Sequence, residues 1–170
     1  MTSNSEVFES AVGRLATAFG HEREHVLADE HARYRLYLEA YRQSPDLRKS
    51  AVDAIAMEPD RAMQQSTVGL LLDEAATRSA SDRDLARWWA TWPETIRRID
   101  YLRRREAEWE VVLRLACGGD LNLSEVSESS DWLQRKLSAQ GRRDVAEFLS
   151  ENGRTRRIRN LASARLTGDL

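Results

Sequence analysis

Apolar residues recur along most of the chain at intervals of three and four, which is the spacing of one face of an α-helix. No run of alternating apolar and polar residues is long enough to predict a strand. We therefore expect an all-α chain, folded as an irregular helical bundle or a short α-solenoid of about nine helices. Before the last three helices, the apolar stripes run over Phe8–Phe19, Leu27–Tyr41, Leu47–Ile55, Met63–Leu71, Leu85–Trp92 and Ile96–Ala116.

Turn-forming residues predict where several of these helices begin and end. Each of the three prolines stands beside an acid, which is typical of a first helical turn, and two serine-led segments resemble N-caps. Glycines are suited to a left-handed cap at the C-terminus of a helix. The predicted starts are Ser44-Pro45-Asp46, Glu58-Pro59-Asp60, Ser81–Asp84, Trp92-Pro93-Glu94 and Ser129–Asp131, and the predicted ends are Gly118-Gly119, Gly141 and Asn152-Gly153.

Residues 118–131 interrupt the helical pattern. They hold four acids, four serines and no basic residue, which predicts an acidic linker or long loop. This segment would separate an N-terminal helical domain, residues 1–117, from a C-terminal three-helix subdomain, residues 132–170, packed on the first. The segments Pro45–Val52 and Arg156–Ala162 resemble helices of HEAT-type repeats, and this resemblance favours an α-helical solenoid or irregular bundle.

Composition narrows the class of protein. The chain has 170 residues, of which 41% are hydrophobic and 32% charged, as in a soluble globular protein. Only Lys49 and Lys136 among the 26 basic residues are lysines, an arginine excess that suggests a bacterial or phage origin. Cys117 is the only cysteine, so no intramolecular disulfide or multi-cysteine metal site can form. Without a leader-like segment or a long apolar run, a cytoplasmic protein is expected.

All three histidines lie in the segment His21–His31, which reads H-E-x-x-H and has a third His at the spacing of a metzincin zinc protease. His21 and His25 would lie one helical turn apart and could bind zinc. However, Ala28 stands where a metzincin has glycine, and on one helix His31 would lie about 280° around from His21. We therefore predict no metal and no cofactor. We expect one helix through this segment, with His31 on its apolar side facing the core.

The C-terminal region is rich in arginine. From Gly141 onward there are seven arginines and four acids. The two helices around Asn152-Gly153 resemble a helix-turn-helix, although their small and apolar residues depart from its usual spacing. An exposed arginine face here could contact phosphate. The candidate nucleic-acid-binding residues are Arg154, Arg156, Arg157 and Arg159.

Trp88 and Trp89 are a candidate partner-binding site. They lie about 100° apart on a helix and flank an apolar stripe, so one of them is expected to be partly exposed.

No nucleophile, base and oxyanion constellation and no glycine-rich phosphate loop is present. The leading expectation is therefore a non-enzymatic protein-binding or scaffold module whose partner is another protein or a second copy of the chain, with no membrane partner. Nucleic-acid binding is the first alternative, and a zinc-dependent hydrolase using His21 and His25 is the second.

Overall fold

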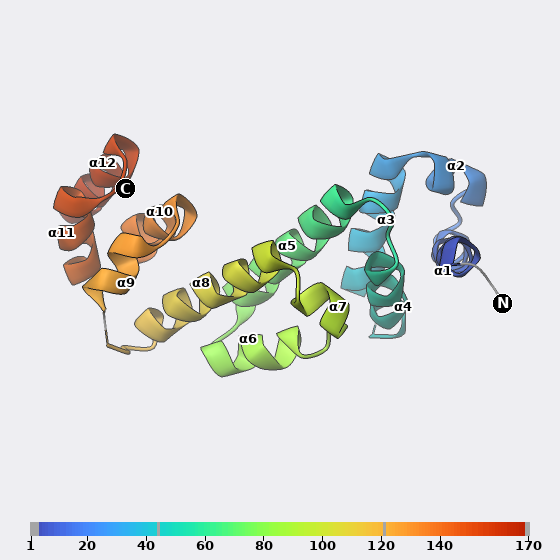
Figure 1. Cartoon of the computed structure of the whole chain (residues 1–170), viewed down its shortest axis with the longest axis horizontal. Helices are drawn as coiled ribbons and strands as arrows, with labels where there is room; N and C mark the ends of the chain where they lie inside the picture. Colours follow the sequence, from blue (N-terminus) through green and yellow to red (C-terminus); the bar gives the residue numbers. More distant parts are fainter. Residues whose placement is uncertain (1–3, 44, 121, 169–170) are drawn as a thin grey trace. The chain divides into compact units, whose positions relative to one another are not determined.

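The computed structural model describes residues 4–43, 45–120 and 122–168, and across these residues it contains twelve helices and no strand (Figure 1). The all-α expectation is confirmed. None of the helices described is both long and apolar enough to cross a membrane. The helices are α1 (Asn4–Ala18), α2 (Arg23–Ala28), α3 (Glu30–Gln43), α4 (Pro45–Ala56), α5 (Arg61–Arg78), α6 (Asp82–Trp89), α7 (Glu94–Arg97), α8 (Asp100–Ala116), α9 (Leu123–Glu128), α10 (Asp131–Gln140), α11 (Arg143–Asn152) and α12 (Arg156–Thr167).

The helices outnumber the expected nine because two expected helices are divided and one further helix forms. The stripe over Leu27–Tyr41 is split between α2 and α3, and the stripe over Ile96–Ala116 is split between α7 and α8. The further helix, α9, lies in the segment predicted as an acidic linker or long loop. Val126 of α9 is only 1% exposed and belongs to an apolar core. This part of the predicted linker is therefore folded.

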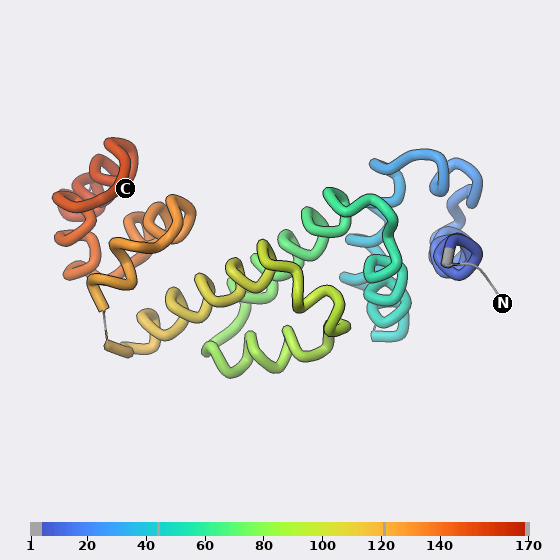
Figure 2. Tube along the Cα trace, viewed as in Figure 1, coloured from blue at the N-terminus to red at the C-terminus, as the bar shows by residue number. Residues whose placement is uncertain are grey.

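The chain forms two compact units, one of residues 1–74 and 89–103 and the other of residues 75–88 and 104–170. These units divide the chain at other places than the segments 1–117 and 132–170, which remain a prediction. In the first unit, α3 packs against α4, and α1 contacts α2, α3 and α4. The ring of Tyr41 stacks on that of Trp92 with centroids 5.9 Å apart. The first four helices of the chain thus pack together in this unit, as the trace in Figure 2 shows, and Trp92 joins them from a later part of the chain.

In the second unit, α10, α11 and α12 all pack against one another, and α9 contacts α10 and α11. These helices share a core cluster of apolar residues with α8, and Gln134 and Ser138 of α10 are buried as well. The buried members of this cluster are Val111, Leu115, Val126, Leu133, Leu137, Val145, Leu149, Ile158 and Ala162. The last four helices therefore share one core with α8, and the predicted subdomain of residues 132–170 stays a prediction.

Most of the predicted helix starts agree with the structure. α4 begins at Pro45, while Ser44 lies outside the described residues. The Ser81 hydroxyl accepts the N–H of Asp84 at 3.2 Å and the Ser130 hydroxyl that of Leu133 at 3.2 Å. At the second proline the cap is Asp60, whose carboxylate accepts the N–H groups of Ala62 and Met63 at 2.9 and 3.0 Å. α5 consequently begins after the proline rather than at it.

The glycines at the predicted helix ends serve two different purposes. Gly118 has a φ of +82° after α8, as expected for a left-handed cap. The same expectation for Gly141 and Gly153 is wrong, because their φ values are −72° and −57°. At Gly153 a Cβ atom would lie 2.6 Å from the Leu149 carbonyl oxygen and 2.7 Å from a methyl group of Ile158. Glycine is needed there for close approach of the chain, not for a positive φ.

Each unit also contains a buried glutamine at a corner between two helices. Gln64, near the start of α5, donates from Nε2 to the carbonyl oxygens of Ile55 and Ala56 at the end of α4. Gln134, near the start of α10, donates in the same way to carbonyl oxygens near the end of α9. The carbonyls at a helix end lack partners within the helix, so each glutamine supplies the donor that its corner needs.

Candidate functional site

The histidine segment is not a single helix, and the expectation that one helix runs through it is wrong. His21 and Glu22 precede α2, which begins at Arg23. Asp29 then adopts an extended conformation, and its carboxylate accepts the His31 N–H at 2.8 Å, so that a new helix, α3, begins. This hydrogen bond also lowers the pKa of the Asp29 carboxyl. The helical H-E-x-x-H that a zinc hydrolase requires is therefore not formed.

His31 does not face the core, which corrects the second expectation for this segment. Its side chain is 82% exposed, and Nδ1 lies 3.8 Å from carboxylate oxygens of both Asp29 and Glu30. Within α3, His31 still lies on the same side as Leu38, but it stands in the first turn, and the residues that α3 buries begin only at Leu36. The residues that α3 buries are Leu36, Tyr37, Leu38, Ala40 and Tyr41.

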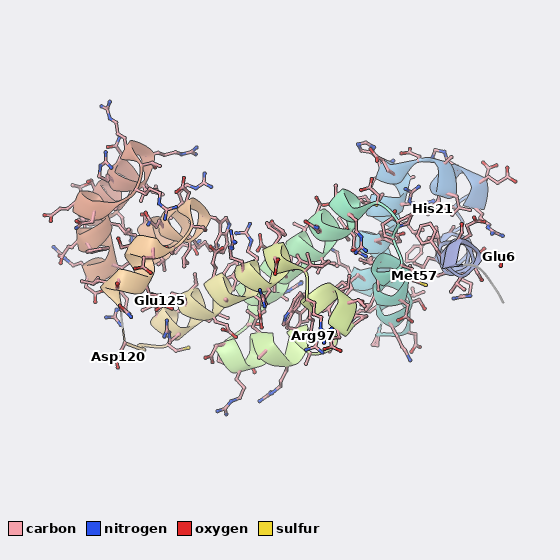
Figure 3. All side chains as sticks on the ribbon, in the orientation of Figure 1. Glu6, His21, Met57, Arg97, Asp120 and Glu125 are labelled. Carbon is pink, nitrogen blue, oxygen red and sulfur yellow. The ribbon has the colours of Figure 1, made fainter. Side chains whose placement is uncertain are left out.

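His21 and His25, the alternative metal ligands, are both exposed. His21, labelled in Figure 3, places Nε2 3.7 Å from a carboxylate oxygen of Glu39, and its ring stacks beside Phe19. Over residues 4–43, 45–120 and 122–168, no three His, Cys, Asp or Glu side chains are grouped so that they could hold a metal ion. These two histidines are thus surface residues of the first unit.

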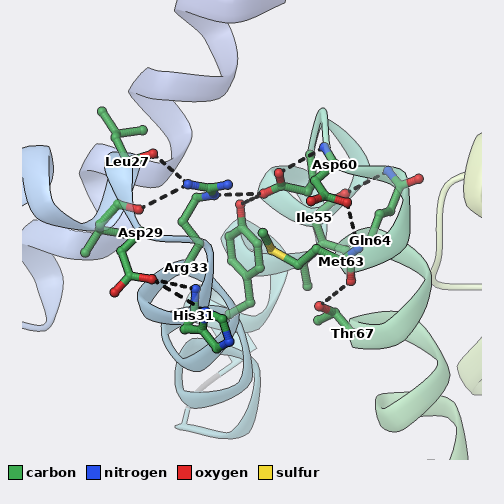
Figure 4. A network of polar contacts seen from close by, with 12 residues as sticks. Leu27, Asp29, His31, Arg33, Ile55, Asp60, Met63, Gln64 and Thr67 are labelled. Carbon is green, nitrogen blue, oxygen red and sulfur yellow. Dashed lines mark hydrogen bonds and ion pairs between the residues drawn. The ribbon is translucent and has the colours of Figure 1, made fainter.

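A buried polar network lies close to this segment (Figure 4). The carboxylate of Glu58 has no exposed surface, and it accepts hydrogen bonds from Arg33 Nε at 3.3 Å, the Tyr37 hydroxyl at 2.7 Å and the Asp60 N–H at 3.1 Å. The other end of the guanidinium donates to the Leu27 carbonyl oxygen at 2.6 Å. Burial, together with the neighbouring Glu58 charge, raises the pKa of the Tyr37 hydroxyl. The network ties α2 and α3 to the junction between α4 and α5.

Beside the network, a surface hollow of about 320 Å³ is lined by His31, Tyr34, Asp60 and Ser66, among others. The Asp60 carboxylate in this hollow is already engaged as the cap of α5. The polar groups of the network likewise hold helices together. We therefore assign this region a stabilising role.

The strongest concentration of unbalanced charge is on α12, which carries four arginines and no acid. Three of them, Arg156, Arg157 and Arg159, lie in its first turn. The Thr155 hydroxyl caps this turn by accepting the Ile158 N–H at 3.2 Å. Because the N-terminal end of a helix carries a partial positive charge, cations placed there are electrostatically unfavourable. Binding of an anion to this end of the helix would relieve that repulsion.

The four candidate arginines divide into two kinds. Arg154 donates to the Ser129 carbonyl oxygen at 2.7 Å and pairs with the Asp131 carboxylate at 3.3 Å. Arg159 donates to the Gly153 carbonyl oxygen at 2.7 Å. These two arginines hold the turn before α12. Arg156 and Arg157 are exposed and make no hydrogen bond or ion pair with any residue that the structure describes, so they are available to an external partner.

Further polar residues continue the exposed face that begins at Arg156. Asn160, Ser163 and Thr167 follow at helical spacing and are all exposed, whereas Ile158 and Ala162 on the opposite side are buried in the core. We call the row Arg156, Arg157, Asn160, Ser163 and Thr167 the α12 face. Sequence periodicity located its arginines, but the short polar residues beyond Asn160 were not recognised as part of the same surface.

The tryptophans are mainly core residues. Trp89 is only 6% exposed and Trp88 is half-buried, which confirms that one of the two is partly exposed. Their use in docking a partner stays a prediction.

A second aromatic cluster was missed by sequence reasoning: Trp109 and Trp132 meet edge to face at 5.3 Å, with the Arg105 guanidinium 3.8 Å above the Trp132 ring. Such cation–π contacts stabilise the second unit.

Comparisons with protein-family models, with curated proteins and with solved structures give no match for this chain.

Proposed function

We propose that this chain is a nucleic-acid-binding protein and that the α12 face makes the contact. The observation that carries the proposal is a helix with four arginines and no acid, in which Arg156 and Arg157 have no partner among the described residues. Arginine binds phosphate well because its planar guanidinium can donate two parallel hydrogen bonds. Nucleic-acid backbones supply phosphate at high density.

The position of the arginines supports the proposal further. Each cation in the first turn of a helix costs about 0.3–1 kcal/mol through the helix dipole. The same helix end is favourable for phosphate, because its backbone N–H groups point outward. A surface that is electrostatically unfavourable in the free protein and favourable with bound phosphate is suited to binding a polyanion.

The turn before α12 would hold this surface in place. Gly153 allows the chain to pass closely between α11 and α12, and the side chains of Arg154 and Arg159 fasten it on either side. A binding surface that is ordered before the ligand arrives loses less conformational entropy on binding. Arg154 and Arg159 are thus positioning residues in this proposal, and Arg156 and Arg157 are contact residues.

Fluorescence anisotropy with labelled oligonucleotides over a series of salt concentrations tests the proposal. The Arg156→Ala/Arg157→Ala protein should bind more weakly and lower the slope of log K against log salt by about 1.8, since two phosphate contacts are lost. The matched control is Arg35→Ala/Arg83→Ala, which removes two exposed arginines elsewhere in the chain. Unchanged affinity in the first variant, or an equal loss in the control, would overturn the proposal.

The protein-binding expectation stays a prediction. In the described part of the chain, the exposed large apolar side chains are Val7, Tyr101 and Leu123, and these lie on three different helices. Scattered single apolar residues are normal on a protein surface and do not mark an interface. For this reason we favour the α12 face over an apolar docking site. Light scattering of the purified chain tests the self-assembling form of that expectation.

A further inference from the structure

We infer, resting on the proposed function, that the ligand is double-stranded DNA and that the α12 face enters its major groove, with Asn160 contacting a base edge. The inference comes from the residue types on this face and their order along the helix. Two arginines stand at the N-terminal end, an asparagine follows, and short hydroxyl side chains complete the row.

The shape of the α12 face fits a groove. Arg156, Asn160, Ser163 and Thr167 fall within about 60° of one another around the helix axis, at about 100° per residue. On this side of the helix the exposed side chains beyond Asn160 are the short ones of Ser163 and Thr167, while the exposed Arg165 lies about 180° from Arg156, so this side is narrow. An α-helix is about 10–12 Å wide with its side chains, and the major groove of B-form DNA is about 12 Å wide. A helix with small residues on its outer face can therefore lie in that groove.

The chemistry of the row matches the base edges exposed in the major groove. An asparagine amide can donate to and accept from adenine at once, and an arginine can donate twice to guanine. The side chain of Asn160 is exposed and makes no hydrogen bond within the described residues. The Ser163 hydroxyl donates to the Arg159 carbonyl oxygen at 3.0 Å, which leaves its lone pairs free to accept a hydrogen bond from a base. The row can thus read sequence as well as bind phosphate.

RNA and single strands fit this surface less well. The major groove of an A-form RNA duplex is deep and too narrow for side chains to read. Proteins that bind single strands usually stack the bases on aromatic side chains, and α12 has no aromatic residue. Duplex DNA is therefore the nucleic acid that this helix fits best.

The packing around α12 resembles that around a helix which its neighbours hold in a DNA groove. α11 and α12 are joined by the three residues 153–155, and α10 supports both. The backbone N–H of Arg154 donates to Gln134 Oε1 at 3.0 Å, which fixes the turn to α10. In helix-turn-helix proteins the second helix of such a pair lies in the major groove while the first crosses the backbone.

The experiment selects binding sequences from a random DNA duplex library with the full chain. It then measures the affinity of the wild type and of Asn160→Ala for the selected duplex, an unrelated duplex, an RNA duplex and single-stranded DNA. We expect Asn160→Ala to weaken binding to the selected duplex by about tenfold to a hundredfold and to alter the preferred base at one position. Its affinity for the unrelated duplex should change by less than about twofold, because phosphate contacts remain. Gln140→Ala, which removes an exposed amide at the end of α10, should match the wild type.

The outcomes separate the inference from the proposed function. If RNA or single-stranded DNA binds as tightly as duplex DNA, the inference of duplex DNA is overturned while nucleic-acid binding stands. If no sequence is enriched, or if Asn160→Ala weakens every duplex equally, base reading by Asn160 is overturned. If Arg156→Ala/Arg157→Ala leaves binding to every polymer unchanged, the proposed function itself is overturned.

Discussion

In each unit a buried glutamine near the start of one helix bonds to the end of the preceding helix, but the charged residues around the two glutamines differ. Gln64 in the first unit and Gln134 in the second both donate from one amide nitrogen to two carbonyl oxygens of the preceding helix, at 3.0–3.1 Å. Next to Gln64 lies the Glu58 network, in which the partner Arg33 is only 11% exposed. Next to Gln134 lies a row of arginines at the surface. The glutamine contact is common to both units, whereas the charged residues beside it are placed differently.

This difference separates two uses of charge in one small protein. In the first unit, a carboxylate and a guanidinium are removed from water and satisfied by each other and by neighbouring hydrogen bonds. The second unit also holds a largely buried pair, Arg105 and Glu108 of α8, but Arg156 and Arg157 of α12 remain in water. Buried charges that match one another fix the arrangement of helices, while unmatched surface charges are available to a partner. Charge in the first unit should therefore affect stability, and charge on α12 should affect binding.

The largest expected effect is at Glu58. The Glu58→Gln protein would leave the Arg33 guanidinium buried without its counter-charge, and we expect its free energy of unfolding to fall by about 3–5 kcal/mol. Urea unfolding measures the change. Glu94→Ala, which removes an exposed partner of Arg98, should lower stability by less than about 0.5 kcal/mol and serves as the control. A loss of stability below about 1 kcal/mol in the Glu58→Gln protein would contradict the claim that the Arg33–Glu58 pair is buried away from water.

The two glutamines test whether the corners are equivalent. Gln64→Ala and Gln134→Ala each remove a donor from two carbonyl oxygens, although Ile55 keeps the Glu58 N–H and Val126 keeps the Ser129 N–H, and each should lower the free energy of unfolding by about 1–3 kcal/mol. The measurement is again urea unfolding, with the two variants compared side by side. If one variant is destabilised and the other is as stable as the wild type, only one of the two glutamines stabilises its unit and the two corners are not equivalent.

The third effect is on the pH dependence of stability. Because the pKa of the Tyr37 hydroxyl is raised in the folded chain, the unfolded chain releases this proton first as the pH rises. Tyr37 therefore stabilises the fold fully below its ordinary pKa of about 10, and stability declines above it by at most about 1.4 kcal/mol per pH unit. Unfolding titrations above pH 10 should show a shallower decline for Tyr37→Phe, which retains the other three tyrosines. Equal slopes would mean that burial at Tyr37 does not hold its proton.

The smallest effect on stability is expected on α12. Replacing Arg156 and Arg157 by alanine removes two cations from the first turn, so the free energy of unfolding should rise by about 0.3–1 kcal/mol for each arginine at low salt. The same variant is expected to lose nucleic-acid affinity. Thermal unfolding at low and high salt checks the stability change, which salt should screen. Destabilisation by more than about 1 kcal/mol would show that these arginines are structural, and the contrast between the units would then fail.

Much of the fold follows from local pattern. The 3.6-residue spacing of apolar side chains predicts the helices, and Ser81 and Ser130 mark helix starts because each hydroxyl accepts the N–H three residues further along the chain. Where the apolar spacing gave a wrong prediction, a short-range hydrogen bond determined the structure instead. The carboxylate of Asp29 accepts the His31 N–H and caps a new helix there, although the apolar spacing continues across it.

The candidate sites depend on contacts between distant residues, which a single sequence does not reveal. Glu58 precedes a proline and looks like an acid at a helix start, yet its partners Arg33 and Tyr37 lie 25 and 21 residues earlier in the chain. The four C-terminal arginines look alike in the sequence. Arg154 differs from Arg156 because the Ser129 carbonyl oxygen and the Asp131 carboxylate, 25 and 23 residues away, come within its reach. Which charges are engaged is therefore decided by tertiary structure.

Gln134 also has a consequence for how the second unit folds. Its nitrogen is bonded to carbonyl oxygens near the end of α9 and its oxygen accepts the Arg154 N–H of the α11–α12 turn, so one side chain links three segments that are separate in the chain. None of these bonds can form before the other segments have docked. We expect α9, α10 and the turn to open together rather than one by one, and their amide hydrogens to exchange with solvent as one cooperative group.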